Sequence, residues 1–375
     1  MSGRRLEAVR RLVVKVGSSL ITAGSSGLDS ERIRVLADEL AALGAAGTEV
    51  ALVSSGAIVA GMARLGRRER PRSIPETQAA AAVGQSALMQ QYETAFARHG
   101  RLVAQVLLTR ADLSARTRYL NARNTLNTLL ACGVLPIINE NDTVAVDEIK
   151  VGDNDNLSAL VAQLIDADLL VLLTDVDGLY RGNPRRDAGA TKLDVVEAIT
   201  PDIERLCWAD AGQIAIGGMA TKLEAAQKAV ASGIPLVIAN GHRPGELTAL
   251  LRGEPIGTYF APRTDRLAAR KRWIGFAVAP QGRLVVDAGA KRAVTERGKS
   301  LLPSGVVDIE GDFDAGEVVA LCAADGDAAE FARGVVNFDA QELRKIKRVK
   351  SSDIERVLGY KSFDEVVHRD NLVLL

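Results

Sequence analysis

The sequence predicts an α/β protein with a mostly parallel sheet and helices on both faces, followed by a small β-rich domain, a barrel or a sandwich. Up to about residue 240, short runs that are apolar throughout alternate with segments of helical period, as expected for parallel strands buried on both faces. Of the 375 residues 47% are hydrophobic but only 4% are aromatic, which suits aliphatic strands under small-residue helices. After about residue 281 the apolar runs become shorter and lie closer together.

The predicted strands and helices follow each other along the first part of the chain. Six apolar runs are predicted strands: Leu12–Val16, Val50–Val53, Leu102–Leu108, Val134–Ile138, Leu169–Leu173 and Pro235–Ile238. Five segments rich in Ala, Leu, Gln and Glu are predicted helices: Ser30–Gly44, Pro75–His99, Ala115–Cys132, Asn156–Ile165 and Ala220–Ser232. Two residues suit helix N-caps, Asp29 before Glu31 and Thr117 before Tyr119. A helix between successive strands favours parallel connections.

A change of rhythm at Thr258–Gln281 marks the predicted joint between two domains. This stretch holds two prolines and the basic cluster Arg270–Arg272. We expect a first domain at residues 1–260, a linker at 261–280 and a second domain at 281–375. The second domain is predicted from four short strands that Gly and Asp separate: Gly282–Val286, Gly305–Ile309, Glu317–Leu321 and Phe331–Val336.

Composition and charge argue against several classes of protein. The 47 basic residues balance the 47 acidic ones, so no overall field favours nucleic acid or an anionic membrane. The three cysteines are widely spaced and lie outside any C-x-x-C pattern, which indicates reduced thiols rather than a disulfide framework or a metal site. The apolar run after the basic start is too short for a signal peptide, and no stretch reaches the roughly 20 apolar residues of a membrane helix. We expect a soluble, cytoplasmic protein.

Polar and glycine-rich residues follow the predicted strands, where open parallel sheets bind their ligands. These segments are Lys15–Ser19, Ser54–Ala57, Asn139–Asp142, Thr174–Tyr180 and the turn Gly217–Lys222 before a helix. Glycine lets backbone N–H groups approach phosphate oxygens, and a helix N-terminus adds the positive end of a dipole. Lys15 and Lys222 could neutralise charge on a transferring phosphoryl group, since that reaction depends mostly on positioning and charge stabilisation.

Plainer interpretations apply to several of these features. A glycine after a strand usually marks only a turn, whereas Lys15 lies inside a strand expected to be buried, where a charge is costly unless it is paired or functional. The sequence lacks G-x-x-x-x-G-K-[ST] and, after the first strand, G-x-G-x-x-G, which argues against a Walker ATPase and a dinucleotide fold. The acidic turn Gly152–Asn156 lacks the glutamate that ends an EF-hand loop.

Taken together, the motifs resemble the amino acid kinase family. The resemblance rests on Lys15–Ser19, Ser54–Ala57, Asn139–Asp142 and Gly152–Asp155, and Thr174–Tyr180 with Gly217–Lys222 narrows it to the branch that phosphorylates glutamate. In the tail, Asp287–Lys291, Gly298–Pro303 and Val367–Leu372 resemble the PUA domain that many bacterial members of this branch carry. The resemblance therefore covers essentially the whole chain.

The resemblance implies transfer of a phosphoryl group from ATP to the side-chain carboxylate of L-glutamate, giving L-glutamyl 5-phosphate, the first step towards proline. Lys15 and Lys222 would stabilise the transferring group, and Asp155 would orient both lysines. The residues implied for glutamate are Ser55, Asn154 and, facing its ammonium, Asp142. The residues implied for ATP are Lys15, Gly17, Ser18, Thr174, Asp175, Ile216, Gly217, Gly218, Met219, Ala220, Thr221 and Lys222. Mg²⁺ would be carried by the ATP phosphates, with no metal site in the protein itself.

A carboxylate acceptor is already ionised at neutral pH, so the reaction requires no general base. His99, His242 and His368 lie in surface-like or terminal contexts, and none is expected to be catalytic. A nucleotide sensor without turnover would be expected to lose a lysine or the orienting acid, and the sequence keeps all three residues.

Two other functions stay open: an amino acid kinase for a different small carboxylate, and an RNA-binding regulator that acts through the tail. Residues 281–375 hold 14 basic and 17 acidic residues, a net charge of −3, so the tail lacks the basic footprint of RNA binding apart from Arg344–Lys350. Family membership implies proline as a feedback inhibitor, with Gly66–Pro75 as a candidate mobile loop. A homo-oligomer and contact with a downstream glutamyl phosphate reductase are also expected.

Overall fold

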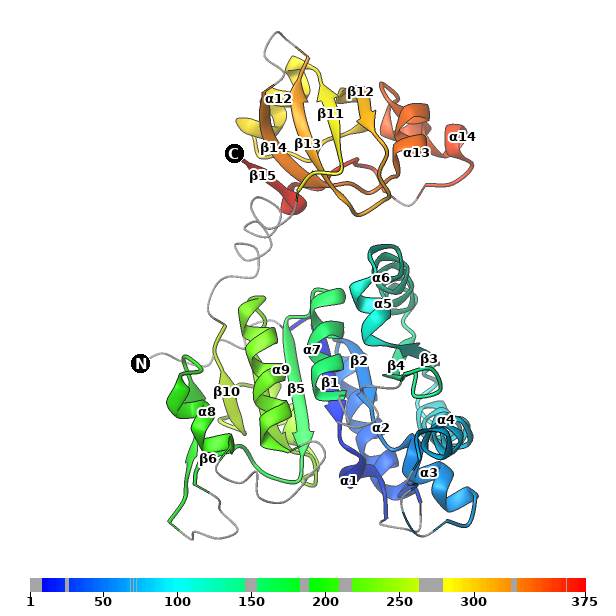
Figure 1. The fold of residues 1–375 in the computed structure, drawn as a ribbon, viewed down its shortest axis with the longest axis vertical. Coiled ribbons are helices and arrows are strands. Elements are labelled where there is room, and N and C mark those ends of the chain that lie inside the picture. Colours follow the sequence, from blue (N-terminus) through cyan, green and yellow to red (C-terminus); the bar gives the residue numbers. More distant parts are fainter. Residues whose placement is uncertain are drawn as a thin grey trace. The chain divides into compact units, whose positions relative to one another are not determined.

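The computed structural model describes residues 9–23, 27–67, 69, 71, 73–145, 154–182, 189–208, 218–262, 279–324, 329–361 and 363–375. The chain divides into two compact units, Met1–Thr264 and Asp265–Leu375, which are described separately (Figure 1). Most of the predicted linker, 263–278, lies outside the described residues, so the predicted domain limits stay a prediction.

The first unit is built on an eight-stranded sheet with the order β3-β4-β2-β1-β5-β9-β10-β8. Its strands are β1 (Arg11–Val16), β2 (Glu49–Ser54), β3 (Val103–Leu108), β4 (Leu135–Glu140), β5 (Leu169–Thr174), β8 (Val195–Val196), β9 (Leu236–Asn240) and β10 (Thr258–Phe260). All neighbouring strands are parallel except β9 and β10. The predicted mostly parallel sheet is confirmed, and all six predicted strands belong to it.

The strands of this sheet pack against helices on both faces. The helices of the unit are α1 (Ser18–Ile21), α2 (Ser30–Ala45), α3 (Ala57–Arg64), α4 (Ile74–Ala97), α5 (Arg110–Ser114), α6 (Arg116–Ala131), α7 (Asn154–Leu164), α8 (Pro201–Trp208), α9 (Met219–Ala231) and α10 (Glu246–Leu251). On β1, Leu12, Val14 and Val16 pack with α1, α2, α4 and α10. Val13 packs with α6, α7 and α9, so by alternation Lys15 also faces that layer (Figure 1).

Helix α4 packs very closely against α3, the helix that follows β2. A Cβ on Gly84 would lie 1.7 Å from the carbonyl oxygen of Ala57, so α3 and α4 pack backbone against backbone only because this residue is glycine. Further along α4, the hydroxyl of Tyr92 lies 2.8 Å from Ser54 Oγ at the end of β2, and both residues are buried. One face of α4 is therefore held against the loop that follows β2.

The two predicted helix N-caps and the predicted joint between the domains all lie at least partly within the described residues. Asp29 is the N-cap of α2 and accepts a hydrogen bond from the Arg32 backbone N–H, as predicted. The predicted cap at Thr117 is wrong, because α6 begins at Arg116 and Ala115 is its N-cap. The predicted joint at Thr258–Gln281 begins too early, because Thr258–Phe260 forms β10 and pairs with β9.

The second unit has a separate five-stranded sheet with the order β12-β11-β13-β14-β15. Its strands are β11 (Gly282–Val286), β12 (Val306–Gly311), β13 (Val318–Ala323), β14 (Glu330–Val335) and β15 (Leu372–Leu374), and its helices are α12 (Ala288–Thr295), α13 (Ala340–Ile346) and α14 (Ile354–Leu358). The β-rich second unit and its four predicted strands are confirmed. No helix in the described parts of either unit is long and apolar enough to span a membrane.

Candidate active site

The carboxyl ends of the central strands lie level with one another at one edge of the first sheet. Val16, the last residue of β1, pairs with Ser54 of β2 on one side and Leu173 of β5 on the other. The polar residues that follow these strands therefore meet at this edge, where open parallel sheets bind ligands.

A buried cluster of three charged side chains, Lys15, Asp155 and Lys222, lies at this edge. Lys15 Nζ is 2.6 Å from Asp155 Oδ1, and Lys222 Nζ is 3.2 Å from Asp155 Oδ2. The side chain of Asp155 is fully buried, and each lysine side chain is 7% exposed. Thr221 donates a 2.7 Å hydrogen bond from Oγ1 to Asp155 Oδ2. The structure thus brings together the three residues that the sequence analysis selects for catalysis.

The charge state of Asp155 follows from these neighbours. Burial alone would raise the pKa of its carboxyl, but the charges of Lys15 and Lys222 and the hydrogen bonds from Lys15 and Thr221 hold that pKa below its usual range. Asp155 is therefore an anion at neutral pH that two ammonium groups share. Because an ammonium carries three N–H donors, this carboxylate can orient each lysine without using all of its donors.

Two glycines stand at helix starts beside the charged cluster. Gly17 precedes α1, and a Cβ on it would lie 3.8 Å from Lys15 Nζ and 3.8 Å from Ser19 Oγ, which are ordinary contact distances. Its φ of −76° is open to any residue, so the fold itself does not require glycine here. Gly218 precedes α9, and its carbonyl oxygen lies 2.9 Å from Thr221 Oγ1.

The other residues predicted to bind ATP lie at the same strand and helix ends. Thr174 is buried at the end of β5 and donates from Oγ1 to Oδ1 of the exposed Asp175 over 3.2 Å. Three more of the residues predicted to bind ATP lie in the first turn of a helix: Ser18 in α1, and Met219 and Ala220 in α9. Ile216 and Gly217 lie outside the described residues.

The residues predicted to bind glutamate lie around the ends of β2 and β4. Asn154, the first residue of α7, donates from Nδ2 to Ser55 Oγ over 2.9 Å, and it directly precedes Asp155. Asp142, in the turn after β4, is half-buried and makes no hydrogen bond or ion pair to any described residue. Burial raises the pKa of its carboxyl to about 6. An unpaired, partly desolvated carboxylate of this kind favours a cationic ligand.

Two further residues, Asn139 and Gln85, join this group; Asn139 belongs to the polar segment predicted after the fourth strand but has no assigned role there, and Gln85 is not selected. Asn139 accepts a 2.9 Å hydrogen bond from Asn154 Nδ2 and donates a 2.9 Å bond to Gln85 Oε1. Asn139 carries a signal in the sequence, since it is the first polar residue after the apolar run of β4. Gln85 carries only a weak one, as a polar residue in a part of α4 that is rich in Ala and Gly.

The described residues contain no group of three or more His, Cys, Asp or Glu side chains that could hold a metal ion. All three histidines are described, and each has a partner away from the charged cluster. His99 Nε2 lies 2.7 Å from Asp38 Oδ1, His242 contacts Arg32, and His368 accepts a 3.2 Å hydrogen bond from the Asp370 N–H. The candidate chemistry therefore depends on lysines, one carboxylate and glycine turns.

Comparison with known proteins gives a consistent result for both units. Residues 10–240 match the model of the amino acid kinase family, and residues 282–358 match that of the PUA domain. The glutamate 5-kinase of Moorella thermoacetica is 54% identical over 370 residues, which cover 99% of this chain and 97% of that protein. The glutamate 5-kinase of Ralstonia pickettii is 55% identical over 366 residues, covering 98% and 97%. The structure of a UMP kinase from Bacillus anthracis, 15% identical, aligns with a TM-score of 0.47 over 68% of this chain and 97% of its own.

Proposed function

This chain belongs to the amino acid kinase family and to the glutamate 5-kinases within it, and we propose that it transfers a phosphoryl group from ATP to the side-chain carboxylate of L-glutamate. The products are ADP and L-glutamyl 5-phosphate. The observation that carries the proposal is the buried Lys15–Asp155–Lys222 cluster at the carboxyl edge of the sheet.

In the proposed reaction, a carboxylate oxygen of glutamate attacks the γ-phosphorus, and the bond from that phosphorus to the β,γ-bridging oxygen of ATP breaks. Lys15 and Lys222 stabilise the negative charge on the transferring group, because preorganised charges in a buried site cost no reorganisation during the reaction. Asp155 keeps both ammonium groups in place, and the lowered pKa of its carboxyl keeps it charged. No side chain acts as a general base, since the attacking carboxylate is already ionised.

The glutamate site is proposed from Asp142, Ser55 and Asn154. Asp142 would accept the α-ammonium of the substrate, which restores a counter-charge to a carboxylate that has no partner among the described residues. Asn154 and Ser55, 2.9 Å apart, would hold the substrate between Asp142 and the lysines. Asn154 and Asp155 are consecutive, so the first turn of α7 links the proposed glutamate site to the charged cluster that would act on the phosphoryl group.

The nucleotide site is proposed from the glycine turns at Gly17 and Gly218 together with Ser18, Thr174, Asp175 and the segment 216–222. Glycine without a side chain lets backbone N–H groups reach phosphate oxygens. A Cβ on Gly17 would lie 3.8 Å from Lys15 Nζ, so glycine at this position leaves the approach to that lysine open. Mg²⁺ is proposed to bind with ATP and to neutralise phosphate charge there. The lysine-rich donor set fits that arrangement, because ammonium groups bind phosphate oxygens and not cations.

Several partners are proposed on family membership alone: proline as a feedback inhibitor, a homo-oligomeric assembly and a downstream glutamyl phosphate reductase. Proline biosynthesis in the cytoplasm is the proposed setting. The candidate inhibitor loop Gly66–Pro75 is described only in part, and Pro75 lies in the first turn of α4. An acyl phosphate hydrolyses readily, which favours direct use of the product by a reductase.

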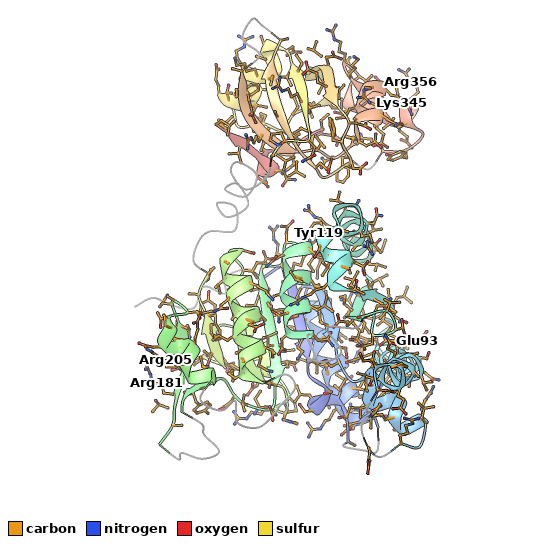
Figure 2. The ribbon with its side chains drawn as sticks, viewed as in Figure 1. Glu93, Tyr119, Arg181, Arg205, Lys345 and Arg356 are labelled. Carbon is orange, nitrogen blue, oxygen red and sulfur yellow. The ribbon has the colours of Figure 1, made fainter. Side chains whose placement is uncertain are left out.

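For the second unit we propose a structural or regulatory role rather than RNA binding. The basic segment Arg344–Lys350 includes the exposed Lys345 (Figure 2). Two other basic residues of this segment, Arg344 and Lys347, lie near acidic side chains. Lys347 Nζ is 2.8 Å from Asp308 Oδ1, and Arg344 lies 3.8 Å from Asp312. Such pairing weakens the local positive field that RNA binding requires.

The test is ADP release with magnesium-ATP and L-glutamate, with hydroxylamine present to trap the acyl phosphate as a hydroxamate. We expect glutamate-dependent hydroxamate, and a fall of kcat by about 10²–10³ in Lys222→Met, as when one transition-state donor is removed. Lys228→Met is the matched control, because Lys228 lies on the same helix and contacts Asn156 instead of Asp155. Turnover of aspartate or acetylglutamate in place of glutamate would assign the chain another substrate within the family, and no turnover of any of them would refute the proposal.

A further inference from the structure

A chain of three amide side chains runs from α4 across the end of β4 to the start of α7. Asn139 Nδ2 donates to Gln85 Oε1, and Asn154 Nδ2 donates to Asn139 Oδ1, each over 2.9 Å. Gln85 is 8% exposed, Asn139 2% and Asn154 9%. Hydrogen bonds between buried amides hold their orientation firmly, because solvent offers no substitute.

The direction of this chain is fixed by a backbone group. The N–H of Glu140 can only donate, and it lies 2.9 Å from Asn139 Oδ1, which must therefore be an oxygen. It follows that Asn154 turns its NH₂ towards Asn139 and that Asn139 turns its NH₂ towards Gln85. Reversing any one of the three amides would set two donors or two acceptors against each other.

With the three amides oriented in this way, the amide at each end of the series has one atom without a hydrogen-bond partner in the described parts of the protein. Gln85 Nε2 is a donor and Asn154 Oδ1 is an acceptor, and both are buried without a hydrogen-bond partner in the described parts of the protein. Buried polar atoms without partners cost free energy and are few in native proteins. A donor at one end and an acceptor at the other indicate a ligand that supplies the two missing groups.

We infer that Gln85 is a specificity-determining residue whose Nε2 donates to the α-carboxylate of the substrate, while Asn154 Oδ1 accepts from its α-ammonium. This inference rests on the proposed function and names the part of glutamate that each amide binds. A carboxylate only accepts hydrogen bonds and an ammonium only donates them, so the head group of an α-amino acid complements both atoms. Its side-chain carboxylate then extends towards Lys15 and Lys222, since Asn154 directly precedes Asp155.

The packing of α4 supports a role for Gln85 at the substrate. The preceding residue, Gly84, lets α4 touch the backbone of Ala57, which lies just after the Ser54–Gly56 loop. This close approach brings the Gln85 side chain to Asn139 at the end of β4. Helix α4 thereby contributes a hydrogen-bond donor to the proposed glutamate site, to which α7 contributes Asn154 Oδ1 and the turn after β4 contributes Asp142.

The inference is tested by comparing L-glutamate with two analogues that differ only at the α-carboxylate. These analogues are 4-aminobutyrate, which lacks the group, and L-isoglutamine, in which it is a carboxamide. A buried donor that loses its partner is a strong means of rejecting an analogue. For each compound, kcat/KM is measured, or the inhibition constant where the compound is not phosphorylated.

Two variants at position 85 distinguish the loss of the Gln85 hydrogen-bond donor from the loss of its hydrogen bond with Asn139. Gln85→Met removes the donor and the acceptor for Asn139, whereas Gln85→Glu keeps that acceptor and replaces only the amide nitrogen by oxygen. We expect both to raise KM for glutamate at least tenfold, to leave KM for ATP within about twofold, and to reduce the preference for glutamate over 4-aminobutyrate at least tenfold. Gln90→Met, at an exposed position on the same helix, is the control.

The outcomes distinguish this inference from the proposed function. If the wild-type protein phosphorylates glutamate and both Gln85 variants lose activity equally for glutamate and for 4-aminobutyrate, Gln85 has only a structural role and the inference is wrong. Unchanged KM for glutamate in both variants would have the same meaning. If the wild-type protein itself gives no hydroxamate with glutamate, the proposed function fails and the inference fails with it.

Discussion

Asp155 Oδ1 lies 2.6 Å from Lys15 Nζ, although Lys15 comes from the central strand β1 and Asp155 from the first turn of α7. The second oxygen of the same carboxylate receives Lys222 and Thr221 from α9. One buried anion therefore links a strand and two helices that are far apart in the sequence. Its position determines where two ammonium groups can act on a phosphate.

Asp155→Asn is expected to reduce both activity and stability. The change leaves two buried ammonium groups without their shared anion, which typically costs about 3–5 kcal/mol in the free energy of unfolding. The sign of the pH dependence follows from the lowered pKa: the stability from Asp155 is present above the unfolded-state pKa of about 3.9 and is lost as pH falls through the lower folded-state pKa. Urea unfolding between pH 3 and pH 7 measures this contribution.

The matched control for Asp155→Asn is Asp202→Asn, at a surface position where the aspartate side chain is 79% exposed and pairs with Arg205. An exposed ion pair contributes about 0–1 kcal/mol, so this variant should unfold like the wild type. Equal losses in the two variants would contradict the assigned role of Asp155, as would a fully active Asp155→Asn enzyme.

Gly17→Ala is expected to weaken ATP binding without destabilising the protein. The backbone at Gly17 suits alanine, and its Cβ would meet only ordinary contacts at 3.8 Å in the protein itself. The added methyl group would instead occupy space beside Lys15 that the proposal assigns to a phosphate. We expect KM for ATP to rise about tenfold, while the free energy of unfolding changes by less than about 1 kcal/mol. An unchanged KM for ATP would remove Gly17 from the nucleotide site.

The fold was predictable from the sequence because its strands carry a strong local signal. Strands β4 and β5 are buried along their whole length, and each begins with a continuous apolar run, Leu135–Ile138 and Leu169–Leu173. The polar residues that end these strands lie where the topology of a parallel sheet places ligand sites. Lys15 was recognisable for a similar reason, as a charge within such a run. The N-cap at Asp29 likewise depends only on residues close to it in the sequence.

The remaining features depend on contacts between distant segments. Gln85 meets Asn139 only because Gly84 lets α4 approach α3, and no local pattern in either segment indicates this contact. The error at Thr258 has a related cause, since β10 is a three-residue strand that is stabilised by pairing with β9 and β8 rather than by its own pattern.

Gly84→Ala is expected to destabilise the first unit and to impair glutamate binding. The new Cβ would lie 1.7 Å from the Ala57 carbonyl oxygen and 2.4 Å from the Gly61 nitrogen, so α3 and α4 must move apart. Overpacking of this kind typically costs about 1–3 kcal/mol, measurable by urea unfolding. Ser86→Ala, at an exposed position on the same helix, should change stability by less than about 0.5 kcal/mol. A Gly84→Ala protein as stable as the wild type would show that the two helices can separate at little cost.

Asp142 provides a prediction about pH and glutamate affinity. Burial raises the pKa of its carboxyl to about 6, so in the free protein the charge that would bind the substrate ammonium is lost as pH falls through 6. Calorimetric titration with glutamate in the absence of ATP should give a Kd that rises as the pH falls below 6. In Asp142→Asn the Kd should be high at every pH and should not show this rise. The absence of ATP matters because its own phosphate titrates near this range.

The same carboxyl should show an opposite effect on stability. A pKa raised from about 3.9 to about 6 means that Asp142 favours the folded state below pH 4 and that this contribution is lost as pH rises through 6. Asp142→Asn should therefore be more stable than the wild type at pH 7.5, by up to about 3 kcal/mol, since one pKa unit corresponds to about 1.4 kcal/mol. Saturating glutamate should reduce this difference, because the ammonium stabilises the wild-type carboxylate and not the amide. A variant that is less stable than the wild type at pH 7.5, yet binds glutamate normally, would place the ammonium elsewhere in the site.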